Sequence, residues 1–173
     1  MKYFSGFALK GEEKFFKSML VETDFTVTGF SYGAQKAFEY AYHSTERVDR
    51  LILFSPAFFQ NEKKSFIKTQ LRYYKADKEA YTQQFLKNVV YPSSLNLSEN
   101  LSTGTLDELE SLLTYTWDKT KLLELQNRGV IIEVFIGAMD KIVNIQESFN
   151  FFSEFITSTY LLKNEGHILQ AIN

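Results

Sequence analysis

The alternation of apolar and polar positions along the 173-residue chain predicts strands and helices in turn. Apolar residues spaced three and four apart predict helices at residues 12–20, 34–42 and 147–156. Runs rich in β-branched and aromatic residues predict strands at 2–5, 25–28, 48–55, 130–137 and 157–162. The apolar run at 51–54 indicates burial on both faces, as in a parallel sheet. The pattern therefore predicts an α/β fold with about five strands in a mostly parallel sheet.

Residues 58–128 follow a different pattern from the rest of the chain. They contain no convincing buried strand, and their apolar spacing predicts helices at 65–74, 78–89, 106–115 and 119–125. This segment interrupts the sheet after its third strand and is too short to form an independent domain. We therefore expect a single domain over residues 1–173, with residues 58–128 inserted as a helical lid.

Composition narrows the class of protein. Hydrophobic residues make up 45% of the chain and charged residues 23%, as in soluble globular proteins, and a net charge of −2 does not favour nucleic-acid binding. The chain has no cysteine, which excludes disulfides, thiol nucleophiles and cysteine metal sites. The apolar stretch near the N-terminus is too short for a signal peptide or a membrane span. We expect a cytoplasmic protein that needs neither a metal nor a cofactor and binds no membrane.

One pentapeptide, Gly29-Phe30-Ser31-Tyr32-Gly33, has the form G-x-S-x-G. It stands between a predicted strand and a predicted helix, which is the context of a nucleophile elbow. The two glycines would let strand and helix pass closely while the turn presents Ser31. We therefore take Ser31 as the candidate nucleophile. The alternative is an ordinary glycine-rich turn between a strand and a helix.

A serine nucleophile needs a base, and the chain has only two histidines. His43 lies near the end of the helix that begins at the elbow, more than about 10 Å from Ser31 at 1.5 Å per residue. It is better placed to interact with that helix end electrostatically. His167 follows the last predicted strand, at the edge where open α/β sheets place their sites. We therefore expect His167 to be the base, the alternative being an ordinary loop histidine.

The base in turn needs an acid between the serine and the histidine in chain order. Asp140 comes three residues after Gly137, at the end of the strongest predicted strand. No acid ends the strand at 48–55, so the usual alternative position is empty. Asp140 is thus the candidate acid, although an aspartate that only caps a turn would look the same.

An oxyanion intermediate needs backbone N–H donors. The Tyr32 N–H, at the start of the elbow helix, is one candidate. Ser5-Gly6-Phe7 ends the first predicted strand, where Gly6 would allow close backbone approach. The Phe7 N–H is therefore the second candidate, and a plain glycine turn is the alternative.

The predicted lid is asymmetric in charge. Residues 60–90 carry seven basic and three acidic side chains, whereas acids outnumber bases in residues 91–129. A basic surface could steer an acidic partner, or it could be a solvated helix face. Five aromatic residues of the lid could line an acyl channel or form the buried side of the helices: Phe66, Tyr73, Tyr74, Tyr81 and Phe85.

Together, several motifs resemble the short BioV-type esterases of biotin synthesis, from one end of the chain to the other. They are Phe4-Ser5-Gly6-Phe7, the elbow with Ala34-Gln35-Lys36-Ala37, Leu53-Phe54-Ser55-Pro56, Gly137 with Asp140-Lys141-Ile142-Val143, and Asn164-Glu165-Gly166-His167. The triad motifs alone are specific only for α/β-hydrolases. The short form, with the oxyanion turn near residue 5 and the elbow near residue 31, points to this subfamily.

The resemblance implies a compact α/β-hydrolase that hydrolyses pimeloyl-[acyl-carrier protein] methyl ester to methanol and the free carboxylate. Ser31, His167 and Asp140 would act as nucleophile, base and orienting acid, with Phe7 and Tyr32 N–H groups holding the oxyanion. The partner would be an acidic acyl carrier protein, which suits a basic lid. Lys68 and Arg72, four residues apart on one helix face, are candidate carrier contacts.

Several matters stay open in the sequence. If the first strand pairs directly with the elbow strand, a right-handed connection would put the first helix on the same face as the elbow helix, whereas a standard hydrolase has it on the opposite face. A general small-acyl carboxylesterase or thioesterase would use the same triad. A hydrolase fold that only docks a partner is a third possibility. The sequence does not settle the oligomeric state or the acyl chain length.

Overall fold

The computed structural model describes residues 1–172, which contain one five-stranded sheet with all strands parallel. The strands lie side by side in chain order: β1 (Lys2–Phe4), β2 (Thr26–Phe30), β3 (Arg50–Phe54), β4 (Ile131–Gly137) and β5 (Thr159–Leu162). The predicted α/β fold with about five strands is confirmed. Because the strands run the same way, their carboxyl ends share one edge, where Ser31, Asp140 and His167 follow their strands.

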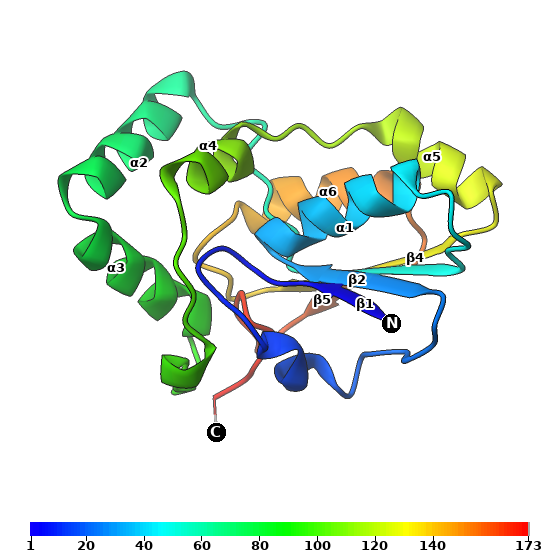
Figure 1. Cartoon of the computed structure of the whole chain (residues 1–173), viewed down its shortest axis with the longest axis horizontal. Helices are drawn as coiled ribbons and strands as arrows, with labels where there is room; N and C mark the ends of the chain where they lie inside the picture. Colours follow the sequence, from blue (N-terminus) through cyan, green and yellow to red (C-terminus); the bar gives the residue numbers. More distant parts are fainter. Residues whose placement is uncertain (173) are drawn as a thin grey trace.

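Three helices cover one face of the sheet: α1 (Tyr32–His43), α5 (Lys119–Asn127) and α6 (Ile145–Phe155) (Figure 1). Ala34, Ala37 and Phe38 of α1 are fully buried and pack with Leu51 and Leu53 of β3. Small residues on α1 let the helix lie close to the sheet. The central strand β3 is buried on both faces along residues 51–54, as its apolar run predicted.

The opposite face is covered by a short 3-10 helix, η1 (Glu12–Phe16), on the other side of the sheet from α1 (Figure 1). The Phe16 ring stacks on Phe54 with centroids 4.4 Å apart and lies 5.2 Å from Phe30. Strand β1 nonetheless pairs directly with β2. The connection from β1 to β2 and the connection from β2 to β3 move in the same direction across the sheet. Because η1 and α1 lie on opposite faces, the two connections have opposite handedness. The first helix therefore lies on the face opposite α1, as in a standard hydrolase, which the sequence had left open.

The prediction of a helix over residues 12–20 was wrong in extent and type. The 3-10 helix ends at Phe16, and the N–H groups of Met19 and Leu20 both donate to the Phe16 carbonyl, which closes the turn. Tertiary contacts favour this short element, because it buries both Phe16 and Glu12 completely.

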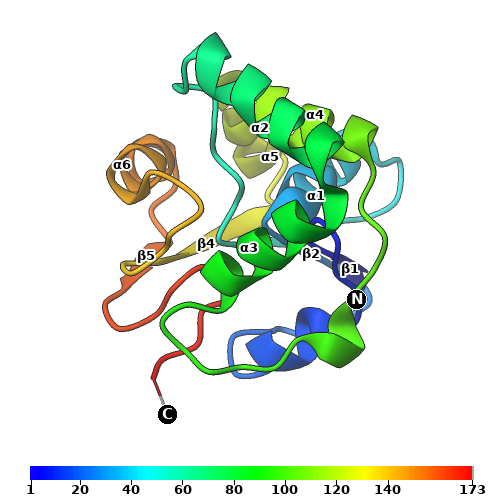
Figure 2. The ribbon, with the colours of Figure 1, turned by 90° about the vertical axis from the view of Figure 1, so that its left-hand side faces the viewer.

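The lid lies across the carboxyl ends of the strands and consists of α2 (Lys64–Ala76), α3 (Lys78–Val90), η2 (Ser98–Asn100) and α4 (Leu106–Thr114) (Figure 2). Asp77 both ends α2 and caps α3, where its side chain accepts the Ala80 N–H. A capping box of Thr105 and Glu108 starts α4. The expected lid of residues 58–128 is too long at its C-terminal end, because α5 packs against α1 and α6 instead. No helix within residues 1–172 has the length and apolar character needed to cross a bilayer.

Candidate active site

The turn between β2 and α1 has the geometry of a nucleophile elbow. Ser31 adopts φ 55° and ψ −114°, a conformation that L-residues with a Cβ rarely occupy. A Cβ added to Gly29 would lie 2.2 Å from the Gly33 carbonyl oxygen, and one on Gly33 would lie 1.9 Å from the carbonyl oxygen of Phe4. Both glycines are therefore required by close backbone contact, and the strained turn places Ser31 at the strand ends.

Three side chains that are far apart in sequence meet at this turn. The Ser31 Oγ lies 2.8 Å from His167 Nε2, and His167 Nδ1 lies 2.6 Å from Asp140 Oδ2. An ionised carboxylate only accepts hydrogen bonds, so Nδ1–H donates to Asp140 and Nε2 accepts the serine proton. All three residues are buried, with His167 fully enclosed. This arrangement can take a proton from Ser31 and stabilise the resulting imidazolium.

Asp140 holds its position through its second oxygen. Oδ1 accepts the N–H of Ile142 at 2.6 Å and that of Val143 at 3.2 Å, while Oδ2 faces His167. The two interpretations considered from the sequence are therefore compatible: one carboxylate oxygen caps the turn and the other orients the histidine.

The loop that carries His167 is fixed by glycine contacts. A Cβ on Gly166 would lie 1.6 Å from the Tyr91 carbonyl oxygen, and one on Gly137 would lie 2.1 Å from the Gly166 carbonyl oxygen. The ring of Phe30 packs on the His167 ring with centroids 5.1 Å apart. The histidine is thus held between the end of β4, the end of β2 and the segment that follows α3.

The other histidine lies outside this site. His43 ends α1, is largely exposed, and places Nε2 3.2 Å from Glu39 one turn earlier. Its location at the C-terminal end of the helix agrees with the electrostatic role expected from the sequence.

The two candidate oxyanion donors lie on adjoining segments. Tyr32 is the first residue of α1, so no carbonyl of that helix can accept its N–H. Phe7 lies in the turn after β1, and the carbonyls of Phe4 and Ser5 contact Gly33 of α1 closely. The backbone N–H of Phe7 donates no hydrogen bond within residues 1–172. Both donors are therefore available for a ligand.

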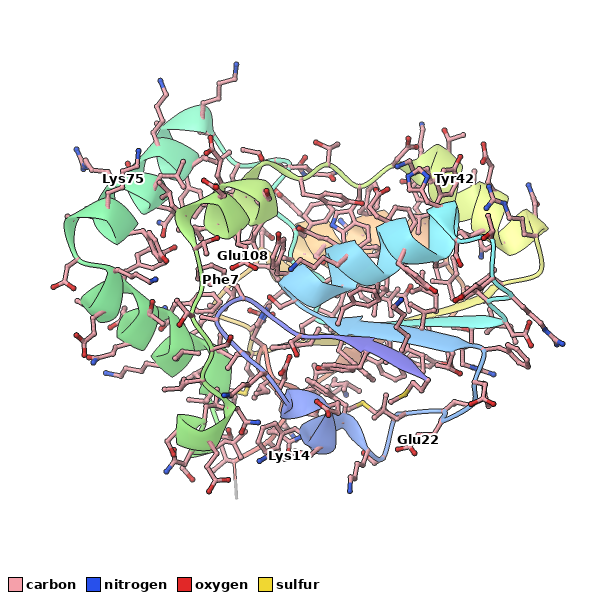
Figure 3. All side chains as sticks on the ribbon, viewed as in Figure 1. Phe7, Lys14, Glu22, Tyr42, Lys75 and Glu108 are labelled. Atoms are coloured by element: carbon pink, nitrogen blue, oxygen red, sulfur yellow. The ribbon has the colours of Figure 1, made fainter. Side chains whose placement is uncertain are left out.

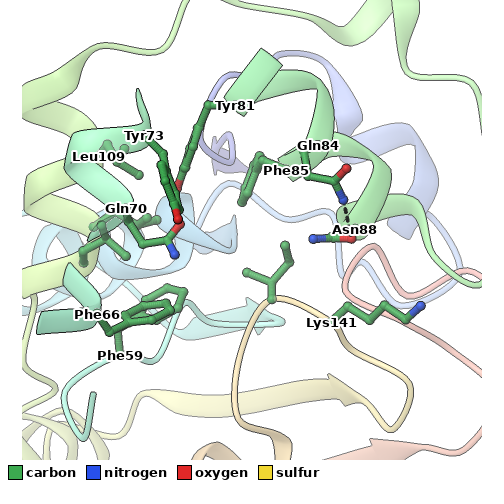
Figure 4. Close-up of a pocket in the computed structure, with 13 residues that line it drawn as sticks. Phe59, Phe66, Gln70, Tyr73, Tyr81, Gln84, Phe85, Asn88, Leu109 and Lys141 are labelled. Atoms are coloured by element: carbon green, nitrogen blue, oxygen red, sulfur yellow. Dashed lines mark hydrogen bonds between the residues drawn. The ribbon is translucent and has the colours of Figure 1, made fainter. Parts of the chain in front are cut away.

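A cavity of about 370 Å³ lies between the lid and the strand ends (Figure 4). Its walls include Phe59 after β3, Leu109 and Leu112 of α4, and Ile142 beside Asp140. Its polar lining is formed by Gln70, Gln84, Asn88 and Lys141. This size is within the usual range for small-molecule sites, and the apolar walls suit an acyl chain.

The predicted lid aromatics divide between the cavity and the core. Phe66, Tyr73, Tyr81 and Phe85 line the cavity. Tyr74 is instead buried, and its hydroxyl donates to the Gly104 carbonyl at 2.7 Å. Burial raises the pKa of the Tyr81 hydroxyl to about 12, so this group stays protonated at neutral pH and donates to Gln70.

Lys68 and Arg72 lie on the exposed side of α2. Phe66, Gln70 and Tyr73 form the face of α2 that lines the cavity. Lys68 is two residues, or about 200°, around the helix from Phe66, and Arg72 follows it one turn later. Neither basic side chain lines the cavity, although the Arg72 guanidinium lies 5.5 Å from the ring centroid of Tyr73, which does. Figure 3 shows Lys75 on the same outer side of the lid, whereas Phe7 lies between the lid and the sheet.

Several residues around the site were not predicted from the sequence. No role was predicted for Phe59, Leu109, Leu112 or Ile142, although a three-to-four-residue spacing of leucines marked the face of α4 that lines the cavity. Glu12, a fully buried carboxylate behind the Gly6 turn, was not predicted either. Nothing local distinguishes Glu12 from its exposed neighbours. No cluster of three or more potential metal ligands occurs within the described residues 1–172.

Comparison with known proteins supports the fold. No protein-family model matches the chain, and no curated protein matches its sequence. An esterase from Exiguobacterium antarcticum superposes with a TM-score of 0.66 and 18% identity, covering 90% of this chain and 63% of the esterase. The carboxylesterase CesB from Bacillus subtilis gives a TM-score of 0.57 and 17% identity, covering 93% of this chain and 61% of CesB.

A structure closer in length is BioG from Haemophilus influenzae, with a TM-score of 0.60 and 10% identity, covering 96% of this chain and 87% of BioG. The chain spans only about three fifths of the esterase and of CesB. At these identities the likeness shows the fold alone. The chain has the α/β-hydrolase fold.

Proposed function

We propose that this protein is a serine carboxylesterase in which Ser31, His167 and Asp140 form the catalytic triad. The observation that carries the proposal is the buried hydrogen-bonded chain from Ser31 through His167 to Asp140, at a strained elbow beside two backbone N–H groups that donate no hydrogen bond within residues 1–172. Backbone strain and buried polar groups reduce stability, and such features cluster at functional sites. Several neighbours in fold are named esterases or carboxylesterases, which supports the same reaction class.

In the proposed mechanism, the Ser31 Oγ attacks the ester carbonyl while His167 Nε2 takes its proton. Asp140 stabilises the imidazolium, and the N–H groups of Phe7 and Tyr32 donate to the oxyanion. The tetrahedral intermediate breaks its bond to the alkoxy group, which leaves as an alcohol with the proton from His167. A water activated by His167 then hydrolyses the acyl-serine and releases the carboxylate.

The substrate we propose is pimeloyl-[acyl-carrier protein] methyl ester, which would yield methanol. The motif resemblance to BioV-type esterases carries this finer assignment, and the apolar cavity is suited to the acyl chain. The seven basic side chains of α2, α3 and the residue before α2 are exposed, and none is in an ion pair within residues 1–172: Lys63, Lys64, Lys68, Arg72, Lys75, Lys78 and Lys87. Such a surface would attract an acidic carrier protein. Because Ser31 is buried, the substrate would have to displace part of the lid.

The decisive experiment measures methanol release from pimeloyl-[acyl-carrier protein] methyl ester by the wild type and by Ser31→Ala. We expect turnover that falls by at least about 10⁴-fold in the variant. A fluorophosphonate probe should label the wild type and leave Ser31→Ala unlabelled.

The other outcomes separate the alternatives. Ser31-dependent hydrolysis of a simple aryl ester without methanol release would keep the triad and replace the carrier-linked substrate with a smaller acyl ester or thioester. No turnover and no labelling of the wild type would indicate a docking module that has kept the hydrolase fold.

A further inference from the structure

Glu12 is a fully buried carboxylate that the proposed triad does not use. Its Oε1 accepts the Gly6 N–H at 2.7 Å and the Tyr3 hydroxyl at 3.2 Å. Its second oxygen, Oε2, has no hydrogen-bond partner within residues 1–172. Burying a carboxyl with one unsatisfied oxygen is costly. If position 12 served only to join η1 to the sheet, an apolar side chain there would do so without that cost.

The backbone group that Glu12 binds belongs to the turn that carries the Phe7 N–H. The Gly6 carbonyl accepts the Leu9 N–H at 3.2 Å, and Ala8 between them has φ 58°. An alanine in this region costs about 1–2 kcal/mol, so the turn persists only if its surroundings hold it. The Gly6 carbonyl and the Phe7 N–H share one planar peptide and point in opposite directions. The Leu9 bond therefore holds the peptide that carries the Phe7 N–H, while Glu12 holds the preceding Ser5–Gly6 peptide, and together they restrict the direction of the Phe7 N–H.

The same turn is pressed against the elbow. A Cβ on Gly6 would lie 2.8 Å from the ring of Phe30, the residue before Ser31. A Cβ on Gly33 would lie 2.6 Å from the Ser5 carbonyl oxygen. Glu12 holds Gly6 by its N–H, and the elbow limits its movement from the side of Phe30. A small rotation of this turn would change the distance between Phe7 N–H and a carbonyl oxygen bound at Ser31.

We infer that Glu12 is a positioning residue: it holds the Gly6 N–H of the Ser5–Gly6 peptide and so anchors the turn whose next peptide aims the Phe7 N–H at the oxyanion, an inference that rests on the proposed esterase function. Its action depends on where the acceptor oxygen lies and not on its charge. A negative charge behind an oxyanion site would oppose the charge that develops there. Glutamine at position 12 can offer an oxygen at the same place. Aspartate is shorter by one methylene group, so its oxygen would lie farther from the Gly6 N–H.

The experiment compares Glu12→Gln and Glu12→Asp with the wild type, by the kcat and KM for p-nitrophenyl butyrate. Glu39→Gln and Glu39→Asp serve as matched controls, because Glu39 of α1 also accepts hydrogen bonds, from Tyr115 and Lys121, away from Ser31. We expect Glu12→Asp to lower kcat about 10- to 100-fold with KM within about 3-fold, since small misplacement of a catalytic group costs up to about 100-fold. Glu12→Gln should keep kcat within about 3-fold of the wild type, and both controls should keep it too.

Three results would overturn the inference: Glu12→Asp with wild-type kcat, equal losses in Glu12→Gln and Glu12→Asp, or a change confined to KM. Thermal melting of each variant separates loss of folding from loss of rate, because a purely structural role would lower Tm without the kcat difference. A wild type that neither hydrolyses the ester nor reacts with a fluorophosphonate would instead refute the proposed function, and this inference with it.

Discussion

The framework at the strand ends and the lid above it are built differently. Six of the twelve residues of α1 are buried, including the two that approach the elbow most closely, Gly33 and Ala34. The thirteen-residue helices α2 and α3 each bury one residue, Tyr74 and Val89. Helices with few buried contacts open at lower free energy than core elements. The proposed catalytic atoms, which need accurate placement, thus lie in the well-packed framework. The surface that would select a substrate lies in the lid, which can open more easily.

The largest expected effect comes from the framework. Asp140→Asn should lower kcat for an aryl ester by about 10⁴-fold, because an amide in place of the carboxylate disfavours the histidine tautomer with a proton on Nδ1. Stopped-flow acylation kinetics measure the loss directly. The amide oxygen can still accept from Ile142 and Val143, so Tm should change by only a few degrees. A loss of less than about 10-fold would mean that Asp140 acts as a turn cap and not on His167.

The second prediction concerns the point where lid and framework meet. Gly166→Ala would place a Cβ 1.6 Å from the Tyr91 carbonyl oxygen, and we expect a loss of about 3 kcal/mol or more of unfolding free energy. Thermal melting should show a Tm lower by roughly 6–12 °C. The matched control is Gly129→Ala, where φ is +86° but no atom lies within 4 Å, so only about 1 kcal/mol is expected. Equal effects in the two variants would show that the contact at Gly166 relaxes easily.

Within the lid, Phe66→Ala should alter acyl preference more than stability. Phe66 is half-buried and lines the cavity, so its removal should lower kcat/KM for an octanoyl ester relative to an acetyl ester by about 10-fold. The control is Tyr160→Ala, an exposed aromatic on β5 that should leave the ratio unchanged. An unchanged ratio in Phe66→Ala would place the acyl chain elsewhere.

The outer face of the lid should matter only for a carrier-bound substrate. Lys68→Glu combined with Arg72→Glu should raise KM for pimeloyl-[acyl-carrier protein] methyl ester by about 10-fold at low salt, with kcat unchanged. The difference should shrink as ionic strength rises. Hydrolysis of an aryl ester should not change, and Lys17→Glu with Lys119→Glu provides a control of equal charge. Loss of activity on the aryl ester would contradict an external role for these side chains.

The smallest effect is on the pH dependence of stability. Burial raises the pKa of the Glu12 carboxyl in the folded protein, with the hydrogen bonds from the Gly6 N–H and the Tyr3 hydroxyl acting in the opposite direction. The folded state therefore holds this proton more tightly than the unfolded state, and the resulting stability is lost as the pH rises from about 4.3 through the raised pKa. Glu12→Gln lacks this loss, so its Tm relative to wild type should increase between pH 4 and pH 7. A constant difference across that range would mean that Glu12 is ionised in the fold without penalty.

Some features followed from local sequence because their causes are local. Gly29 and Gly33 around Ser31 predicted a tight turn, and the structure shows the backbone contacts that demand both glycines. The chain order of strand ends predicted that Asp140 and His167 would approach Ser31, since parallel strands bring their carboxyl ends together. Their role in catalysis is our proposal.

Other features depended on tertiary packing. The face covered by η1 and its end at Phe16 follow from stacking on Phe54 and Phe30, which no local pattern encodes. The boundary of the lid follows from the packing of α5 against α1 and α6, although its helical pattern resembled that of its neighbours. Tyr74 is buried in the core and Phe66 lines the cavity. This difference likewise depended on which side of the lid helices α2 and α3 faces the rest of the protein.

The sequence by itself determined the α/β class, the succession of strands and helices along the chain and the position of the elbow, because periodicity and glycine sterics act over a few residues. The tertiary structure alone decided the hand of the first connection, the shape of the cavity and the burial of Glu12 behind the Gly6 turn. Those features arise where residues far apart in sequence pack against one another. The arrangement adopted is the one that buries the most apolar surface while satisfying the backbone donors.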